Sequence, residues 1–189
     1  MGNLPNGVLA SDTQYAKVTL NDSANANGKI STSLYVSGYN FNIPSTAFIQ
    51  GIKVDVQRFY VTIDNASVKD SSVMLLKAGN PVGQNYASSV SWPTSNGNRT
   101  YGSAADLWGT SWTPADINNS AFGVDLKAVR IGPAGTTANA FVDFVKVTVY
   151  YSLSNPPTAT ITLPSGMTIS KGSFADPHNN NITVSGSLL

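Results

Sequence analysis

Few residues in this chain of 189 residues have the chemistry for catalysis. The only histidine, His178, lies in the segment "ADPHNNN", and a Ser-His-Asp triad would have to be built on it. No G-x-S-x-G segment accompanies it, so we interpret His178 as a solvated loop residue. The chain has no cysteine, which excludes disulfides, thiolate zinc sites and a cysteine nucleophile. One histidine is also too few for a zinc site.

The carboxylates are the second candidate for chemistry, because paired carboxylates hydrolyse glycosides. All ten acidic residues are aspartates. Several lie on expected outward strand faces (Asp55, Asp125) or in expected loops (Asp64, Asp70, Asp106). Asp143 shares the parity of inward residues on the last long strand, and we expect it to lie beyond the core edge or to pair with Arg58 or Arg130. We therefore expect no catalytic pair and no enzymatic activity.

Calcium is the remaining candidate ligand. The segment "NDSANANGK" (residues 21–29) loosely resembles a calcium loop, with Ser23, Asn25 and Asn27 alternating before Gly28. The position that should carry a bidentate glutamate is Leu34. An Asn-rich turn, whose side chains bond their own backbone, explains the segment better. We expect no metal and no cofactor.

The segment "WTPADI" predicts one helical turn. Thr113 suits the N-cap, Pro114 suits the first helical position, and Asp116 stands where a carboxylate favours the helix N-terminus. We expect a single capped turn that ends before the next strand.

Two tryptophans, Trp108 and Trp112, precede or flank this turn. Trp112 is placed to pack against Ile117, and Trp108 would then cover the edge of the same core. We expect both rings in the core. The alternative, a tryptophan platform that stacks on sugar rings, requires exposed rings.

Composition favours an all-β protein. Charged residues make up 11% of the chain, there is no glutamate, and Ser, Thr, Asn and Gly are abundant. The net charge is +1 with basic residues scattered singly, so we expect no nucleic-acid partner. No window approaches the roughly 18 apolar residues of a spanning helix, and the N-terminal residues do not resemble a secretory signal. We expect no membrane partner and no export by a classical signal.

Hydrophobic alternation predicts short strands separated by turns, as in an antiparallel β-sandwich of the jelly-roll kind. The strand over residues 49–63 turns one set of residues inward: Ile52, Val54 and Val56. After Gln57 the apolar parity changes, and a β-bulge near Gln57 or Arg58 would return a second set to the inside: Phe59, Val61 and Ile63. Two later strands have these expected inward residues: Phe122, Val124 and Leu126, then Val145, Val147, Val149 and Tyr151.

The remaining segments set the expected domain organisation. We expect strands at residues 15–20 and 30–41, a turn-rich loop at 64–72 and a short buried strand at 73–79. We expect residues 1–45 to form an N-terminal arm and first strands, 46–151 the sandwich core, 152–157 a Pro-rich linker, and 158–189 a small β extension with a hairpin and one more strand. About thirty residues are too few for an independent core, so this extension should lean on the main domain or on a neighbour.

Four segments carry a resemblance to a known family: "IQGIKVDV", "DSSVMLLKAG", "YGSAADLWGTSWTPADIN" and "VDFVKVTVYY". Over residues 49–151 the chain resembles a β-sandwich module of bacteriophage virion structural proteins, also found in large bacterial surface proteins. The resemblance implies a non-enzymatic component of the virion, as a head decoration, collar or tail protein. It implies partners among other virion proteins and copies of the chain itself, with a trimer as one arrangement. The alternative is a carbohydrate-binding or adhesion module of a bacterial envelope protein, which would bind a surface glycan.

Overall fold

The structure is a computed structural model, and it describes residues 14–22, 24–153, 159–162 and 182–185. Strand is the dominant element throughout, with one helix of five residues, α1 (Pro114–Asn118). In the part of the chain that is described, no helix could span a membrane. The all-β prediction with one helical turn is therefore confirmed.

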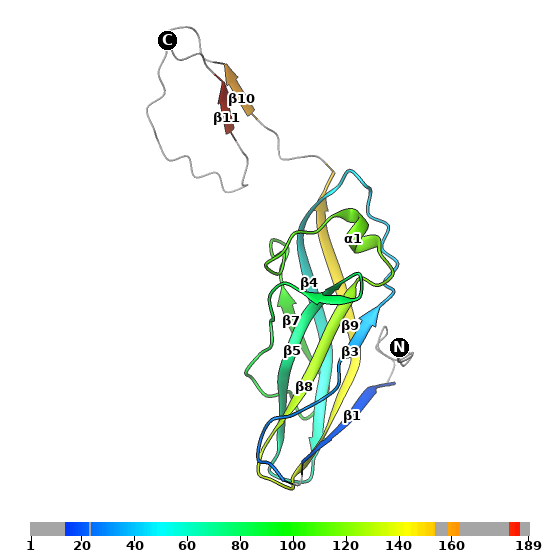
Figure 1. The fold of residues 1–189 in the computed structure, drawn as a ribbon, viewed down its shortest axis with the longest axis vertical. Helices are drawn as coiled ribbons and strands as arrows, with labels where there is room; N and C mark the ends of the chain where they lie inside the picture. The colour runs from blue at the N-terminus through cyan, green and yellow to red at the C-terminus, as the bar shows by residue number, and fades with distance from the viewer. Residues whose placement is uncertain (1–13, 23, 154–158, 163–181, 186–189) are drawn as a thin grey trace.

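Two antiparallel sheets form the sandwich (Figure 1). The four-stranded sheet has the order β1 (Ala16–Asn21), β9 (Thr137–Ser152), β4 (Phe48–Thr62) and β7 (Gly97–Gly102). The other sheet contains β2 (Lys29–Ile30), β3 (Leu34–Ser37), β8 (Gly123–Ile131), β5 (Ser67–Lys77) and β6 (Asn80–Val82). Both β2 and β3 pair with the same strand, β8, so the single strand expected over residues 30–41 is two short strands.

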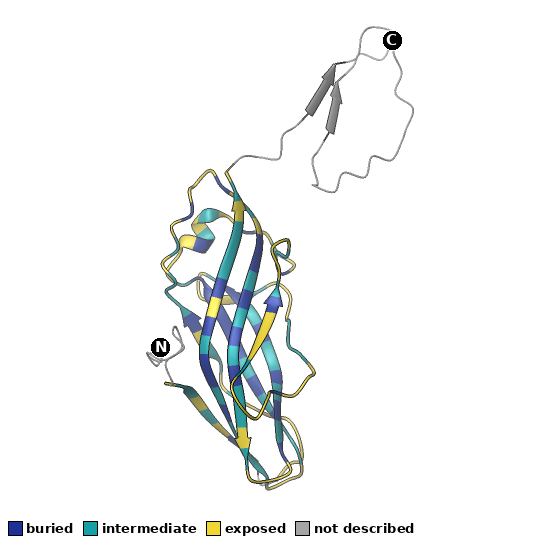
Figure 2. Ribbon diagram, turned by 180° about the vertical axis from the view of Figure 1, so that it is seen from behind, coloured by how far each residue is buried: buried dark blue, intermediate teal, exposed yellow. Residues whose placement is uncertain are grey.

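The core lies between the sheets. Buried and less buried residues alternate along the long strands (Figure 2), as expected when one face of each sheet is covered. The expected inward residues of β4, of β8 with the residue before it, and of the middle of β9 are buried or nearly so: Ile52, Val54, Val56, Phe122, Val124, Leu126, Val145, Val147 and Val149. Tyr151, also expected inside, is 42% exposed because it lies at the end of β9, beyond the core.

The expected β-bulge exists, but its extra residue lies on the neighbouring strand. Gln57 pairs with Phe144 and Arg58 pairs with Val142, so Asp143 of β9 is the inserted residue. The parity of β4 consequently does not change. Arg58 therefore points into the core, and Phe59 and Val61 point away from it. Ile63, just after the strand, is 97% exposed. The expectation that Phe59, Val61 and Ile63 face the core is wrong.

The prediction of a loop over residues 64–72 is also wrong, because β5 begins at Ser67. Val68 and Asp70 are buried on the inner face of this strand, and a register shift lies between Asp70 and Ser72. A charged residue at an inward position hides the hydrophobic alternation that would have revealed the strand. In the C-terminal extension, β10 (Ala159–Thr162) pairs in parallel with β11 (Ile182–Ser185). The second strand of the expected hairpin, at residues 167–170, lies outside the described residues.

Candidate functional site

Both tryptophans of the expected helical region are interior residues. Trp108 is 0% exposed and Trp112 is 7% exposed. The Trp108 indole donates a hydrogen bond to the carbonyl of Ile52 at 2.8 Å, and the Trp112 indole donates to the carbonyl of Leu107 at 3.0 Å. The core placement is confirmed, and neither ring can serve as a platform for sugars.

Neighbouring residues hold Trp108 in place. The Asp106 carboxylate accepts a hydrogen bond from the Trp108 backbone at 2.7 Å and another from the Tyr86 hydroxyl at 2.6 Å, which raises the pKa of Tyr86. A Cβ at Gly102 would lie 2.5 Å from the Trp108 indole nitrogen and 2.3 Å from the carbonyl of Ile52. Only glycine leaves room for the indole there, so the "YG" and "DLWG" segments work as one packing unit.

The capped turn has the predicted geometry. The Thr113 hydroxyl accepts from the Asp116 backbone at 3.2 Å, and the Asp116 carboxylate accepts from the Thr113 backbone at 2.9 Å. Partial burial acts to raise the pKa of Asp116, but bonds from Lys77 and Thr113 outweigh it and lower the pKa. Ile117 lies buried in the same core as Trp112.

Removal of the cap should have a measurable, pH-dependent cost. We expect Thr113→Ala to lower the free energy of unfolding by about 1 kcal/mol at neutral pH. Because the folded pKa of Asp116 is lowered, its contribution is present above its ordinary pKa of 3.8 and is lost as the pH falls through the folded value. Urea unfolding of Asp116→Asn at neutral and acidic pH tests this. A cost for Asp116→Asn that does not shrink toward pH 3 would contradict the assignment.

Asn118, at the end of α1, was not singled out from the sequence. Its side-chain oxygen accepts from the Ile43 backbone at 2.8 Å, and its amide nitrogen donates to the Ile43 carbonyl at 2.8 Å. This two-bond clamp ties the helical turn to the loop before β4. The "ADIN" segment therefore contributes to folding by holding this loop in place.

A buried polar cluster, Arg58, Asp70, Trp92 and Tyr101, lies between the sheets. The Asp70 carboxylate accepts hydrogen bonds from the Arg58 guanidinium, from the Trp92 indole at 2.8 Å and from the Tyr101 hydroxyl at 2.7 Å. The Ser88 backbone donates a fourth, at 2.9 Å. Asp70 was expected in a loop, and Arg58 was considered as a partner for Asp143; the structure pairs Arg58 with Asp70 instead.

The charges of this cluster are compensated within the core. The Arg58 guanidinium also lies 4.7 Å from the centroid of the Trp92 ring and 5.5 Å from that of Tyr101. Burial, and next the Asp70 charge, raise the pKa of Tyr101 far above its ordinary value. Both charged side chains are almost fully buried. The cluster therefore joins β4, β5 and β7 from inside the sandwich.

The other aspartates are distributed as follows. Asp55 lies on the outer face of the four-stranded sheet, where it accepts from Thr100 at 2.6 Å and pairs with Lys53 at 3.0 Å. Asp125 is on the outer face of the other sheet, as expected, but is only 1% exposed, and burial raises its pKa. Asp143 is buried at the bulge. His178 lies outside the described residues.

The Asn-rich segment forms a local turn. The Asp22 carboxylate accepts from the backbone of Ala24 at 3.0 Å and of Asn25 at 3.1 Å, and the Asn27 side chain accepts from the Gly132 backbone at 2.7 Å. The Asp22 bonds are those of the expected Asn-rich turn. Gly132 is 105 residues from Asn27, so the Asn27 bond instead ties this segment to the residues after β8. Among the described residues, no group of three or more His, Cys, Asp or Glu side chains is placed to hold a metal.

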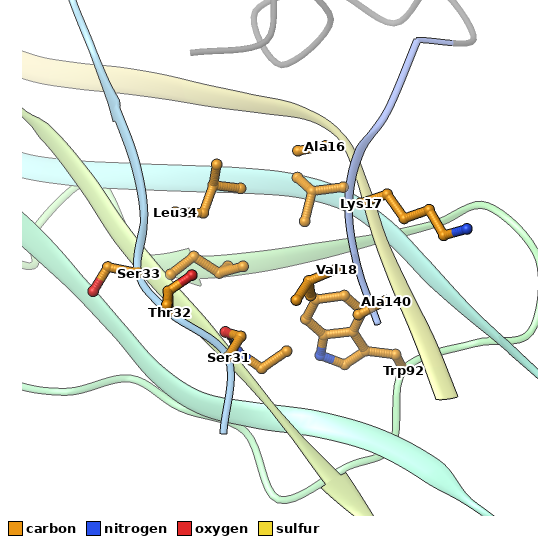
Figure 3. Close-up of a pocket in the computed structure, with 12 residues that line it drawn as sticks. Ala16, Lys17, Val18, Ser31, Thr32, Ser33, Leu34, Trp92 and Ala140 are labelled. Atoms are coloured by element: carbon orange, nitrogen blue, oxygen red, sulfur yellow. Dashed lines mark hydrogen bonds between the residues drawn. The ribbon is translucent and has the colours of Figure 1, made fainter. Parts of the chain in front are cut away.

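A cavity of about 130 Å³ opens between β1 and the segment that joins β2 to β3 (Figure 3). Its wall includes Trp92 and Val18, and its rim carries the hydroxyls of Ser31, Thr32 and Ser33. Pockets that enclose small molecules usually measure about 300–1,000 Å³. This cavity is too small to enclose a sugar residue.

The outer face of the four-stranded sheet presents aromatic rings instead. Phe59 of β4 lies directly opposite Phe141 of β9, with ring centroids 4.6 Å apart and planes 5° apart. Tyr15 contacts both rings edge-on, at 5.2 and 6.0 Å. All three are partly exposed, and Val61 beside them is 45% exposed. We call Tyr15, Phe59 and Phe141 the aromatic row.

Polar side chains border the aromatic row on both sides. On one side, Thr19 of β1 is the cross-strand partner of Asn139 of β9, and its hydroxyl donates to the Asn139 side-chain oxygen at 2.7 Å. On the other side, the Gln57 amide donates to the Asn98 side-chain oxygen at 3.2 Å. Because residues on one face of a sheet recur every second position, these pairs and the aromatic row share the outer face. This face is the best candidate for a binding site.

Comparison with known proteins places the chain in no established family. No protein-family description matches it, and no curated protein matches it. One solved structure, described as "CBM4 structure and function", is similar with a TM-score of 0.39 and 12% sequence identity, over 77% of this chain and 90% of that one. A likeness of this size is too weak to carry an argument about ligand or function. The fold itself defines the class of the protein as an antiparallel β-sandwich.

Proposed function

We propose that this chain is a non-catalytic β-sandwich module that binds carbohydrate on the outer face of its four-stranded sheet. The aromatic row between two rows of amide and hydroxyl side chains is the observation that carries the proposal. The tryptophans first considered for this role are buried. The site that we propose is therefore built from Phe59, Phe141 and Tyr15.

The chemistry of this face matches that of a sugar ring. A pyranose presents axial C–H groups that pack on the electron-rich aromatic system, while its equatorial hydroxyls need hydrogen-bond partners at the rim. Asn139 accepts the Thr19 bond through its oxygen, which leaves its amide nitrogen to donate to a ligand hydroxyl. The face is open, so it suits one side of an extended chain rather than an enclosed monosaccharide.

Alanine variants of the row test the site. We expect Phe59→Ala and Phe141→Ala each to weaken glycan binding at least about tenfold on an array and in titration calorimetry, because each removes half of the stacked pair. Tyr35→Ala is the matched control, since Tyr35 is 48% exposed on the outer face of the other sheet. Thermal unfolding shows which variants remain folded. Undiminished binding by a folded Phe59→Ala/Phe141→Ala double variant would refute the site.

A second candidate function concerns location rather than ligand. The "DLWG" and "WTPADIN" segments, which carry the resemblance to phage virion modules, fold here into one packing unit with Trp108, Asp106 and the capped turn. On that resemblance we propose, as the second candidate, a structural component of a bacteriophage particle, on its surface and in contact with other virion proteins or copies of itself. A module on a particle surface can also bind host glycan, so both candidates can hold together.

Purified particles test the second candidate. Mass spectrometry of particles from a producing host should find the protein in a stoichiometry typical of structural components, and light scattering of the isolated chain should find an oligomer. A protein confined to the cell fraction and absent from particles would contradict the virion location.

A further inference from the structure

The outer face of the four-stranded sheet has more positive than negative charge. Among the described strand residues of this face there are three lysines, Lys17 on β1, Lys53 on β4 and Lys146 on β9, against one carboxylate, Asp55. Asp55 pairs with Lys53 at 3.0 Å and is the direct cross-strand neighbour of Lys146. Desolvation acts to raise the pKa of Asp55, but the Thr100 hydrogen bond, the bond and charge of Lys53 and, least of these, the charge of Lys146 outweigh it and lower the pKa. The carboxylate is thus shared by two lysines, and the surplus charge is positive.

Lys17 is the lysine that belongs to the aromatic row. It lies opposite Phe141 in the register, and its ammonium nitrogen lies 5.5 Å from the centroid of the Phe141 ring. Its side chain points away from the cavity between the sheets (Figure 3). Among the described residues, no carboxylate oxygen lies within 4.0 Å of it. A ligand that packs on Phe59 and Phe141 would therefore meet an ammonium group that is not neutralised.

We infer that the carbohydrate recognised by this face is acidic, with a carboxylate on the sugar ring or beside it. This inference rests on the proposed function. The sugar packs on the aromatic row, and its carboxylate accepts a charge-assisted hydrogen bond from Lys17. A neutral sugar would leave the surplus charge uncompensated and would gain only the stacking and the amide contacts. The surplus on the face also favours the approach of an anionic chain.

Matched pairs of saccharides test the inference. The probes are an oligogalacturonate and its methyl ester, and sialyllactose and its methyl ester, so that the members of each pair differ only in whether the carboxylate is free. We expect at least one acidic member to bind about tenfold more tightly than its neutral partner at ~50 mM salt, and the preference to shrink at ~500 mM salt because exposed charges are screened. Lys17→Gln should reduce the acidic member to the affinity of the neutral one and leave the neutral one unchanged.

A lysine on the other sheet supplies the control. Lys127→Gln removes one positive charge from the outer face of the sheet that contains β8 and should leave the preference intact. Equal affinity for both members of each pair, or equal loss of both in Lys17→Gln, overturns the acidic ligand while the aromatic site still stands. Absence of binding to all four probes, together with an array on which nothing depends on Phe59 or Phe141, overturns the proposed function as well.

Discussion

Asp70→Ala is expected to destabilise the fold by about 3–5 kcal/mol, because it leaves the Arg58 guanidinium buried without its counter-ion. The substitution also removes the acceptor of the Trp92 indole, the Tyr101 hydroxyl and the Ser88 backbone. Each such loss adds a desolvation cost. Equilibrium unfolding in urea, followed by tryptophan fluorescence, measures the change.

An exposed aspartate provides the comparison. Asp55→Ala breaks a surface pair with Lys53 and should cost no more than about 1 kcal/mol. The double variant Arg58→Met/Asp70→Leu should be more stable than Asp70→Ala, because it removes both buried charges together. If Asp70→Ala were as mild as Asp55→Ala, the polar cluster would not hold the sheets together as described.

Trp108→Ala is expected to cost about 3–5 kcal/mol through the cavity that it leaves in the core. The ring is fully buried, packs against Tyr86 with centroids 4.6 Å apart, and donates to the Ile52 carbonyl. Trp108→Phe keeps part of the volume and loses that hydrogen bond, so it should cost less. Thermal and urea unfolding give both values. A Trp108→Ala protein with wild-type stability would mean that the "DLWG" segment does not pack as a core unit.

Local sequence codes predicted part of this structure well. The capping box depends on Thr113 and Asp116, which are three residues apart, so the turn could be inferred without knowledge of the rest of the fold. The alternation of Ile52, Val54 and Val56 similarly requires only that one face of a strand be covered. Both features follow from neighbours in the sequence.

Features that depend on pairing between distant segments could not be predicted. The position of the bulge was expected near Arg58, but the inserted residue is Asp143, about 85 residues further along the chain, and only the register of β4 against β9 decides this. Asp70 was assigned to a loop because the hydrogen bonds that offset the cost of burying its charge come from other segments of the chain. The donors are Arg58, Trp92 and Tyr101.

The aromatic row was missed for the same reason. Phe59 was assigned to the core from its parity, and Tyr15 and Phe141 lie in segments far apart in the sequence. They meet only because β1, β9 and β4 are neighbours in one sheet. The sequence did contain a signal for an apolar outer face. On the same strand, the inward residues Ile52, Val54 and Val56 are followed by a second apolar set at the alternate positions: Phe59, Val61 and Ile63. Such a strand carries apolar residues on both faces, and its second face is a candidate for binding.

Mapping a bound saccharide onto the amide spectrum is the most direct test of the central claim that the binding surface is the outer face of the four-stranded sheet. Titration with a glycan that the array identifies should shift backbone amide signals of residues 15–19, 57–61 and 139–144 and leave those of residues 105–118 unchanged. Shifts centred instead on residues 105–118, around Trp108 and Trp112, or on the cavity rim at Ser31, Thr32 and Ser33, would contradict the account.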